Sequence, residues 1–293
     1  MNRRALMLLI ALVLIWGGNW PILKIALLYL SPLWLVALRL GLGTLCLFVW
    51  VALVERRVPL PRRSELPLVF SVGLLQLAAF SILINLGLRH VEAGRSAILS
   101  YTTPLWVAPA AVLVLGERLR PAQIGGLVLG LAGVAVLFNP LTFDWADPDQ
   151  RLGNLCLMLG ALAWACGIIH VRAHRWRSSQ LVLAPWQMLV GLVPTTLLAL
   201  LVEGPPQPRW GWELAGAVLY TGTLATAFAF WAAITVARAV PALTAALAFL
   251  AVPVFGLACS AVALGEPLTL PTLAGFGLIL AGVATVTVAG NRT

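Results

Sequence analysis

The stretch Leu115-Gly116-Glu117, followed by Ala132-Gly133-Val134-Ala135, decides the fold, because both runs recur 149 residues later. The second copies read Leu264-Gly265-Glu266 and Ala281-Gly282-Val283-Ala284. Chance can align leucine with leucine in an apolar chain, but it does not align glycine and glutamate in one register. The chain of 293 residues is therefore built from two copies of one unit.

The repeat extends beyond these runs. Pro104 falls on Pro253 at the same shift, and Trp16 falls on Trp164 at a shift of 148. We expect the two copies to form a single membrane domain. Their predicted bounds are residues 1–143 and 144–293.

The composition excludes a water-soluble fold. Hydrophobic residues make up 61% of the chain and charged residues 10%, against about a quarter charged in soluble domains. Apolar runs of about 20 residues, each long enough to cross a bilayer as a helix, follow one another between short polar loops. We therefore expect an all-α integral membrane protein with ten transmembrane helices. The predicted spans are residues 5–23, 32–54, 66–88, 96–115, 122–138, 152–171, 180–202, 213–234, 242–264 and 272–289.

The basic residues predict the orientation of these spans. Of the 19 Lys and Arg residues, 13 lie in segments on the side of the N-terminus, five lie on the other side, and Arg39 lies within a span. Because cytoplasmic loops carry the excess of Lys and Arg, we expect both termini in the cytoplasm and the protein in a bacterial inner membrane. The net charge of +9 reflects this topology and not a nucleic-acid surface.

The number of spans in each copy is odd. With five spans per copy, the second copy enters the membrane from the side opposite to the first. Inverted repeats of this kind are typical of secondary transporters, which bind their substrate near the midplane between the halves. The sequence thus predicts two inverted five-helix repeats around a central cavity.

Pro104 and Pro253 stand near the middle of the fourth and ninth predicted spans. Each removes a backbone donor, which leaves the carbonyls of Ser100 and Phe249 without a helical partner. Helix breaks at matching positions indicate a transport pathway. The alternative is a packing kink whose freed groups are satisfied by neighbouring helices.

Polar and aromatic side chains deep in the spans are the candidates for contact with a substrate. Gln76 and Phe80 share one helix face, and Asn85 follows in the same span. Uncharged polar groups at this depth line either a helix interface or a wet cavity. The candidate cavity residues are Trp16, Gln76, Phe80, Asn85, Ser100, Tyr101, Trp164, Phe228 and Phe249. For Phe228 and Phe249, roles in a gate or in the core both remain open.

Three charged residues are interpreted separately. Glu117 and Glu266 stand just before the last span of each copy, where we expect each carboxylate to cap that helix rather than to bind substrate. Arg39 either meets a substrate carboxylate or extends along its helix to bond carbonyl groups.

The spans lack several kinds of chemical group. No Asp or Glu lies deep in any predicted span, which favours facilitated diffusion over proton antiport and argues against a pump for cationic drugs. The sequence has no H-E-x-x-H motif and no pair of buried aspartates, so we expect no enzyme, and we expect no metal and no cofactor.

The motifs resemble those of the drug/metabolite transporter superfamily, in its ten-helix EamA-type group. The resemblance rests on Ile15-Trp16-Gly17 with Asn19 and Pro21, and on the two Leu-Gly-Glu runs with the glycines that follow them. It covers the whole chain and is greatest for bacterial exporters of aromatic amino acids. It implies a bundle whose central cavity includes Trp16, Gln76, Phe80, Asn85, Tyr101 and Trp164.

On this resemblance we expect a monomeric exporter of small neutral or zwitterionic metabolites, in contact with membrane lipid and not with nucleic acid. The alternative is an exporter of the same architecture for another metabolite or drug, such as a nucleoside or a cysteine-type metabolite. An intramembrane enzyme is a distant alternative.

Overall fold

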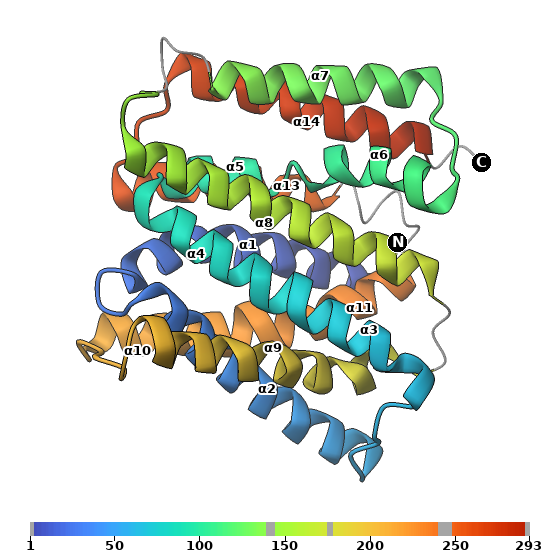
Figure 1. Ribbon diagram of the computed structural model, residues 1–293, viewed down its shortest axis with the longest axis vertical. Coiled ribbons are helices and arrows are strands. Elements are labelled where there is room, and N and C mark those ends of the chain that lie inside the picture. Colours follow the sequence, from blue (N-terminus) through green and yellow to red (C-terminus); the bar gives the residue numbers. More distant parts are fainter. Residues whose placement is uncertain (1–2, 139–143, 175–177, 240–247, 291–293) are drawn as a thin grey trace.

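The computed structural model describes residues 3–138, 144–174, 178–239 and 248–290 (Figure 1). Within these residues the chain is helical and contains no strand. The helices of the first half are α1 (Arg3–Ala26), α2 (Pro32–Glu55), η1 (Arg63–Glu65), α3 (Leu66–Ser71), η2 (Val72–Ala79), α4 (Phe80–His90), α5 (Ala93–Ser100), α6 (Thr103–Leu115) and α7 (Pro121–Leu137). Those of the second half are α8 (Pro148–Ala173), α9 (Gln180–Val202), α10 (Trp212–Leu219), η3 (Tyr220–Phe228), α11 (Ala229–Ala239), α13 (Ala251–Leu264) and α14 (Leu270–Gly290).

The predicted all-α membrane fold is confirmed. Eight stretches of the described chain are long and apolar enough to cross a bilayer, and two shorter apolar helices, α7 and α13, bring the number to ten. The helix of the eighth span runs to Ala239, five residues past the predicted end, and residues 242–247 of the ninth span lie outside the described part. The other predicted ends agree with the structure to within four residues. Hydropathy locates these helices well because their length is set by the thickness of the bilayer.

The third span of each copy differs from a plain α-helix. In both, the middle of the span is a π-helix, η2 in the first copy and η3 in the second. Hydrogen bonds to the fifth residue back widen the turn, and such segments occur often at functional sites. The two segments begin 148 residues apart, so the repeat includes this irregularity.

The fourth span is divided next to its proline. Helix α5 ends at Ser100 and α6 begins at Thr103, directly before Pro104. The hydroxyl of Thr103 donates to the carbonyl of Ser100 at 3.0 Å, which replaces the bond that the proline removes. In the second copy α13 begins at Ala251, two residues before Pro253, and residues 240–247 of this span lie outside the described part.

The helices pack in pairs that keep the same pattern when the two halves are exchanged. Helix α7 packs along α14, and α2 packs along α9. Helix α4 packs on α8, and the equivalent pair in the other half is α11 with η3 on α1. Helix α1 packs on α13, and the equivalent contact is that of α8 with α5 and α6. In Figure 1 the pair α7 and α14 forms the upper edge of the molecule and α2 lies at the lower edge, with α1 and α13 between.

Candidate functional site

The first group of candidate residues gathers where α4 meets α8. The rings of Phe80 and Trp164 meet edge to face, with their centroids 4.6 Å apart. The side-chain amide of Gln76 donates to the backbone carbonyl of Trp164 at 3.4 Å. Gln76 also packs on Gly167, where a methyl group would come within 2.9 Å of its Cδ. Gln76 and Phe80 lie within and directly after the π-helix η2, so the widened turn positions both against α8.

The second group lies where α1 meets the helices of the other half. The Trp16 and Phe249 rings are 5.6 Å apart, and the Trp16 indole donates to the carbonyl of Ala225 at 3.1 Å. Trp16 and Phe228 pack on the same cluster of buried apolar side chains from α1 and α11. Phe228 is the last residue of η3.

The two groups are built alike across the repeat. In each, a tryptophan from the first helix of one copy is hydrogen-bonded to the π-helix of the other copy, Trp164 to Gln76 and Trp16 to Ala225. Each tryptophan also meets a phenylalanine ring, Phe80 or Phe249. Trp16 and Trp164 are 148 residues apart, and so are Phe80 and Phe228. The sequence predicted all four residues but not their relation through the π-helices, because hydropathy carries no signal for an i to i+5 bond.

Asn85, Ser100 and Tyr101 lie outside these two contacts. Asn85 is fully buried in α4, where its amide nitrogen donates to the carbonyl of Ser81 at 2.8 Å and its Oδ1 has no hydrogen bond within the described part of the chain. Ser100 donates its hydroxyl to the carbonyl of Ser96 in the same helix at 2.8 Å, so this hydroxyl is already engaged. Tyr101 packs, together with Phe80, against the large apolar core.

Arg39 is hydrogen-bonded to the second π-helix. Its counterpart in the repeat, Gln187, was not among the candidate residues predicted from the sequence. The Nε of Arg39 donates to the hydroxyl of Thr226 at 2.9 Å, and this hydroxyl donates to the carbonyl of Thr221. A shift of 148 places Gln187 opposite Arg39 in the repeat. Gln187 is 1% exposed, and both polar atoms of its side chain lack a hydrogen bond in the described part. A search for the repeat partner of the one basic residue within a span would have found it.

The prediction that Glu117 and Glu266 cap the last helix of each copy is wrong, because neither carboxylate binds the amides of that helix. Glu266 accepts the backbone amides of Ala93 and Gly94, at 2.5 and 2.8 Å, and so caps α5. Glu117 instead accepts from Arg172 at 2.5 Å, and both side chains are nearly half exposed. Each carboxylate stands four residues before the first residue of the following helix, α7 or α14, which is too far along the chain for a cap. The amide of Thr272 in α14 is instead bound by the hydroxyl of Thr269.

A cluster of charges surrounds this cap. Lys24 donates to the carbonyls of Leu88 and Val91, at 2.5 and 2.7 Å, where α4 ends. Partial burial and the neighbouring Glu266 raise the pKa of Glu92 above its usual value, while Arg95 and Lys24 act in the opposite direction.

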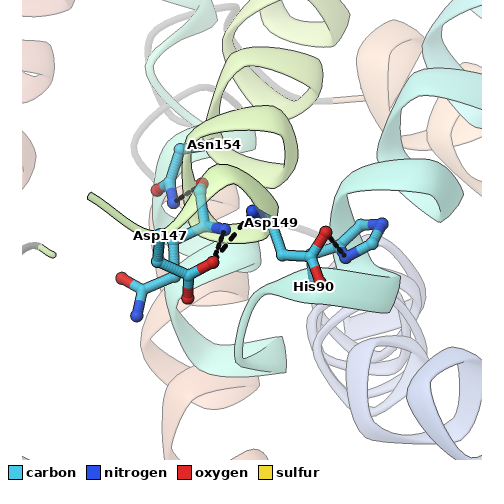
Figure 2. Close-up of polar contacts among 5 residues, drawn as sticks. His90, Asp147, Asp149 and Asn154 are labelled. Atoms are coloured by element: carbon cyan, nitrogen blue, oxygen red, sulfur yellow. Dashed lines mark hydrogen bonds and ion pairs between the residues drawn. The ribbon is translucent and has the colours of Figure 1, made fainter. Parts of the chain in front are cut away.

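A cavity of about 280 Å³ opens beside this cluster. It is lined by His90, Val91, Glu92, Arg95, Leu137, Gln150, Asn154, Thr269, Pro271 and Thr272. Figure 2 shows the polar contacts next to the lining residues His90 and Asn154. The His90 ring faces Asp149, with 3.5 Å between Nδ1 and Oδ1, and Asp147 caps α8 by accepting the amide of Asp149 at 2.9 Å. Within the described residues, no three His, Cys, Asp or Glu side chains are grouped to hold a metal ion.

A model of the EamA-like transporter family matches the chain twice, at residues 3–139 and 151–288. The chain belongs to this family. The probable amino-acid metabolite efflux pump of Salmonella typhimurium is 30% identical, over 97% of this chain and 94% of that protein. The uncharacterized transporter YoaV of Bacillus subtilis is 26% identical, over 94% of both chains. A solved structure, 22% identical, superposes with a TM-score of 0.67 over 100% of this chain and 99% of its own, and so shares the fold.

These relatives are named as transporters or efflux pumps. The EamA protein described here is accordingly a multi-pass membrane transporter of small molecules and not an enzyme. The family model matches once in each half of the chain, at the two copies of the sequence repeat.

Proposed function

We propose that this EamA protein exports small neutral or zwitterionic metabolites, above all aromatic and other amino acids, across a bacterial inner membrane by alternating access. The observation that carries the proposal is the pair of aromatic contacts, Trp164 with Phe80 and Trp16 with Phe249, in which each tryptophan is also hydrogen-bonded to a π-helix. Aromatic faces beside uncharged amides suit a flat, uncharged ligand group. The printed name of the Salmonella relative, an efflux pump for amino-acid metabolites, points to the same class.

The helix pairing supports alternating access. Because the pattern of contacts keeps its form when the halves are exchanged, each half can adopt the packing of the other at similar free energy. We take the two units to be residues 1–143 and 144–293, inserted in opposite senses, with a shared cavity near the midplane. The candidate lining comprises Trp16, Gln76, Phe80, Asn85, Ser100, Tyr101, Trp164, Phe228 and Phe249.

The distribution of charged residues supports an orientation in the membrane and an energy source for transport. The excess of basic residues on the side of the N-terminus supports a topology with both termini in the cytoplasm. Arg39, the basic residue that the sequence places within a span, donates its Nε to the Thr226 hydroxyl. Since the sequence offers no carboxylate deep in a span to carry a proton, we propose facilitated movement down the substrate gradient by a monomer.

Transport into vesicles tests this proposal. The purified chain is reconstituted in liposomes, and uptake of labelled phenylalanine, tyrosine and tryptophan is compared with uptake by protein-free liposomes. We expect saturable uptake that does not depend on a pH gradient. If a nucleoside or cysteine is taken up while phenylalanine, tyrosine and tryptophan are not taken up above the control, the proposed aromatic amino-acid substrates are wrong and the solute that is taken up defines the substrate class. Uptake that requires a proton gradient would contradict facilitated movement.

A further inference from the structure

The cavity beside α5 is lined at the ends of five helices, which lie at the left of the molecule in Figure 1, opposite the side where α1 begins and α14 ends. Three helices begin around it, α5, α8 and α14, and two end there, α4 and α7. Helix starts carry partial positive charge and helix ends partial negative charge, so the walls present both signs. Its volume of about 280 Å³ lies near the lower limit of pockets for small organic ligands.

Arg95 is fixed as the cation in this wall. Its Nε donates to Oδ1 of Asn154 at 2.9 Å, and its Nη2 donates to the carbonyl of Leu137 at 2.8 Å. Its guanidinium also stacks over the Phe138 ring, 5.4 Å from the centroid. Asn154 is itself held by the carbonyl of Gln150 at 2.7 Å. These contacts from α7 and α8 orient the guanidinium before any ligand arrives.

Glu92 supplies the opposite charge in the same wall of the cavity. It stands three residues before Arg95, and side chains with this spacing at a helix start are neighbours. Both line the cavity, together with the hydroxyls of Thr269 and Thr272 and the apolar side chains of Val91 and Leu137. An anion and a cation side by side, next to an apolar wall, match the charged head and the side chain of an α-amino acid.

The repeat shows that these charges belong to one face only. At the shift of 149, Glu92 corresponds to Pro241 and Arg95 to Thr244, and at the shift of 148 Asn154 corresponds to Leu6. Trp16 and Trp164 recur in both copies, whereas this pair of charges occurs in one copy alone. The second copy therefore offers no equivalent pair of charges at the opposite face of the membrane.

We propose that this cavity is a second binding site, specific to one face of the membrane, for a zwitterionic α-amino acid. Arg95 binds the carboxylate and Glu92 binds the ammonium group, while Val91 and Leu137 contact the side chain. That this face is the outer one rests on the proposed topology, whereas the binding itself rests on the cavity alone.

Binding to the purified full-length chain in detergent tests the site with three probes. These are L-phenylalanine, 3-phenylpropionate, which lacks the ammonium group, and phenethylamine, which lacks the carboxylate. By calorimetry, E92Q is expected to weaken L-phenylalanine about tenfold and to leave 3-phenylpropionate within about twofold, since a tenfold change corresponds to one lost ionic contact. R95Q is expected to weaken L-phenylalanine and 3-phenylpropionate and to spare phenethylamine.

Two comparisons make the outcome decisive. Arg89→Gln removes an exposed charge near the cavity that does not line it, and is expected to bind all probes as the parent does. Because Arg95 holds several structural contacts, the size-exclusion profiles of R95Q and the parent are compared to detect misfolding. If R95Q misfolds, the test rests on Glu92→Gln, which removes no hydrogen bond that caps α5. Equal affinities of the parent and E92Q for L-phenylalanine, or an equal loss in Arg89→Gln, would overturn the site.

Failure of the site and failure of the transport proposal are distinguishable. An amino-acid binding event that E92Q weakens, in a protein that moves no amino acid across liposomes, supports the site and contradicts the export proposal. Amino-acid flux in a protein whose binding is insensitive to both E92Q and R95Q contradicts the site and supports export.

Discussion

Glu266 holds the backbone amide of Gly94 at 2.8 Å and so ties the second half of the chain to the first turn of α5 in the first half. Glu117, its counterpart in the repeat, is bound to an arginine side chain instead. Two carboxylates in equivalent sequence positions thus close the two ends of the bundle by different contacts. The contact of Glu266 is more buried and uses two backbone donors, whereas Glu117 and Arg172 are nearly half exposed.

The difference predicts unequal costs for removing the two charges. Glu266→Gln weakens two charge-assisted hydrogen bonds and is expected to lower the free energy of unfolding by about 1.5–3 kcal/mol. Glu117→Gln breaks an exposed ion pair and is expected to cost about 1 kcal/mol or less. Thermal unfolding of both variants in the same detergent measures the difference. Equal shifts in Tm would show that the cap on α5 adds nothing beyond a surface ion pair.

Trp164 offers a test of the aromatic groups. Trp164→Ala removes the ring that meets Phe80 and is expected to reduce amino-acid flux at least about tenfold, because stacking faces supply much of the binding to a flat ligand. Trp164→Phe keeps a ring there and is expected to retain most of the flux. Trp212→Ala, at a position that is 93% exposed, is the matched control. Flux in Trp164→Ala equal to that in the control would exclude Trp164 from the pathway.

The sequence predicted the parts of this structure that depend on apolar length and on the repeat. Hydropathy located the helices because a bilayer fixes their length, and the shifts of 148 and 149 located the matching prolines, tryptophans and glutamates. The π-helices were not predicted, because the choice between a bond to the fourth and to the fifth residue back depends on packing against helices distant in sequence, α8 and α9 for η2 and α1 and α2 for η3.

The partner of Glu266 was missed for a related reason. A capping motif is recognised within a few residues of one helix, but Glu266 reaches a helix that begins 173 residues earlier in the chain. Such a contact depends on how the halves pack. Gln187 was overlooked because a glutamine in an apolar run carries no charge signal, and only its relation to Arg39 through the repeat singles it out.

Glu92 predicts a dependence of stability on pH. Its pKa is raised in the folded chain by burial and by Glu266, against the opposing effect of Arg95 and Lys24, so the folded state binds a proton more tightly than the unfolded state does. Stability is therefore expected to rise as the pH falls through the raised pKa, and to level off below the ordinary pKa of glutamate. Tm measured from neutral to acidic pH is compared between the parent and E92Q. The rise should be smaller in E92Q, and identical pH profiles would contradict the shift.

Two adjacent glycines in α7 test how closely the last helices of the two copies must pack. A methyl group on Gly126 would lie 2.8 Å from the carbonyl oxygen of Gly282 in α14, while a methyl group on Gly125 would meet nothing within 4 Å. Gly126→Ala is therefore expected to push α7 away from α14 and to destabilise the protein by about 1–3 kcal/mol, as overpacking does in other cores. Gly125→Ala is expected to be neutral or to stabilise slightly, because alanine favours a helix. The two variants have the same composition and lie one residue apart, so a difference in Tm between them reports the helix contact alone. Equal Tm values would mean that α7 and α14 separate without cost, and that their close approach is not what joins the two copies.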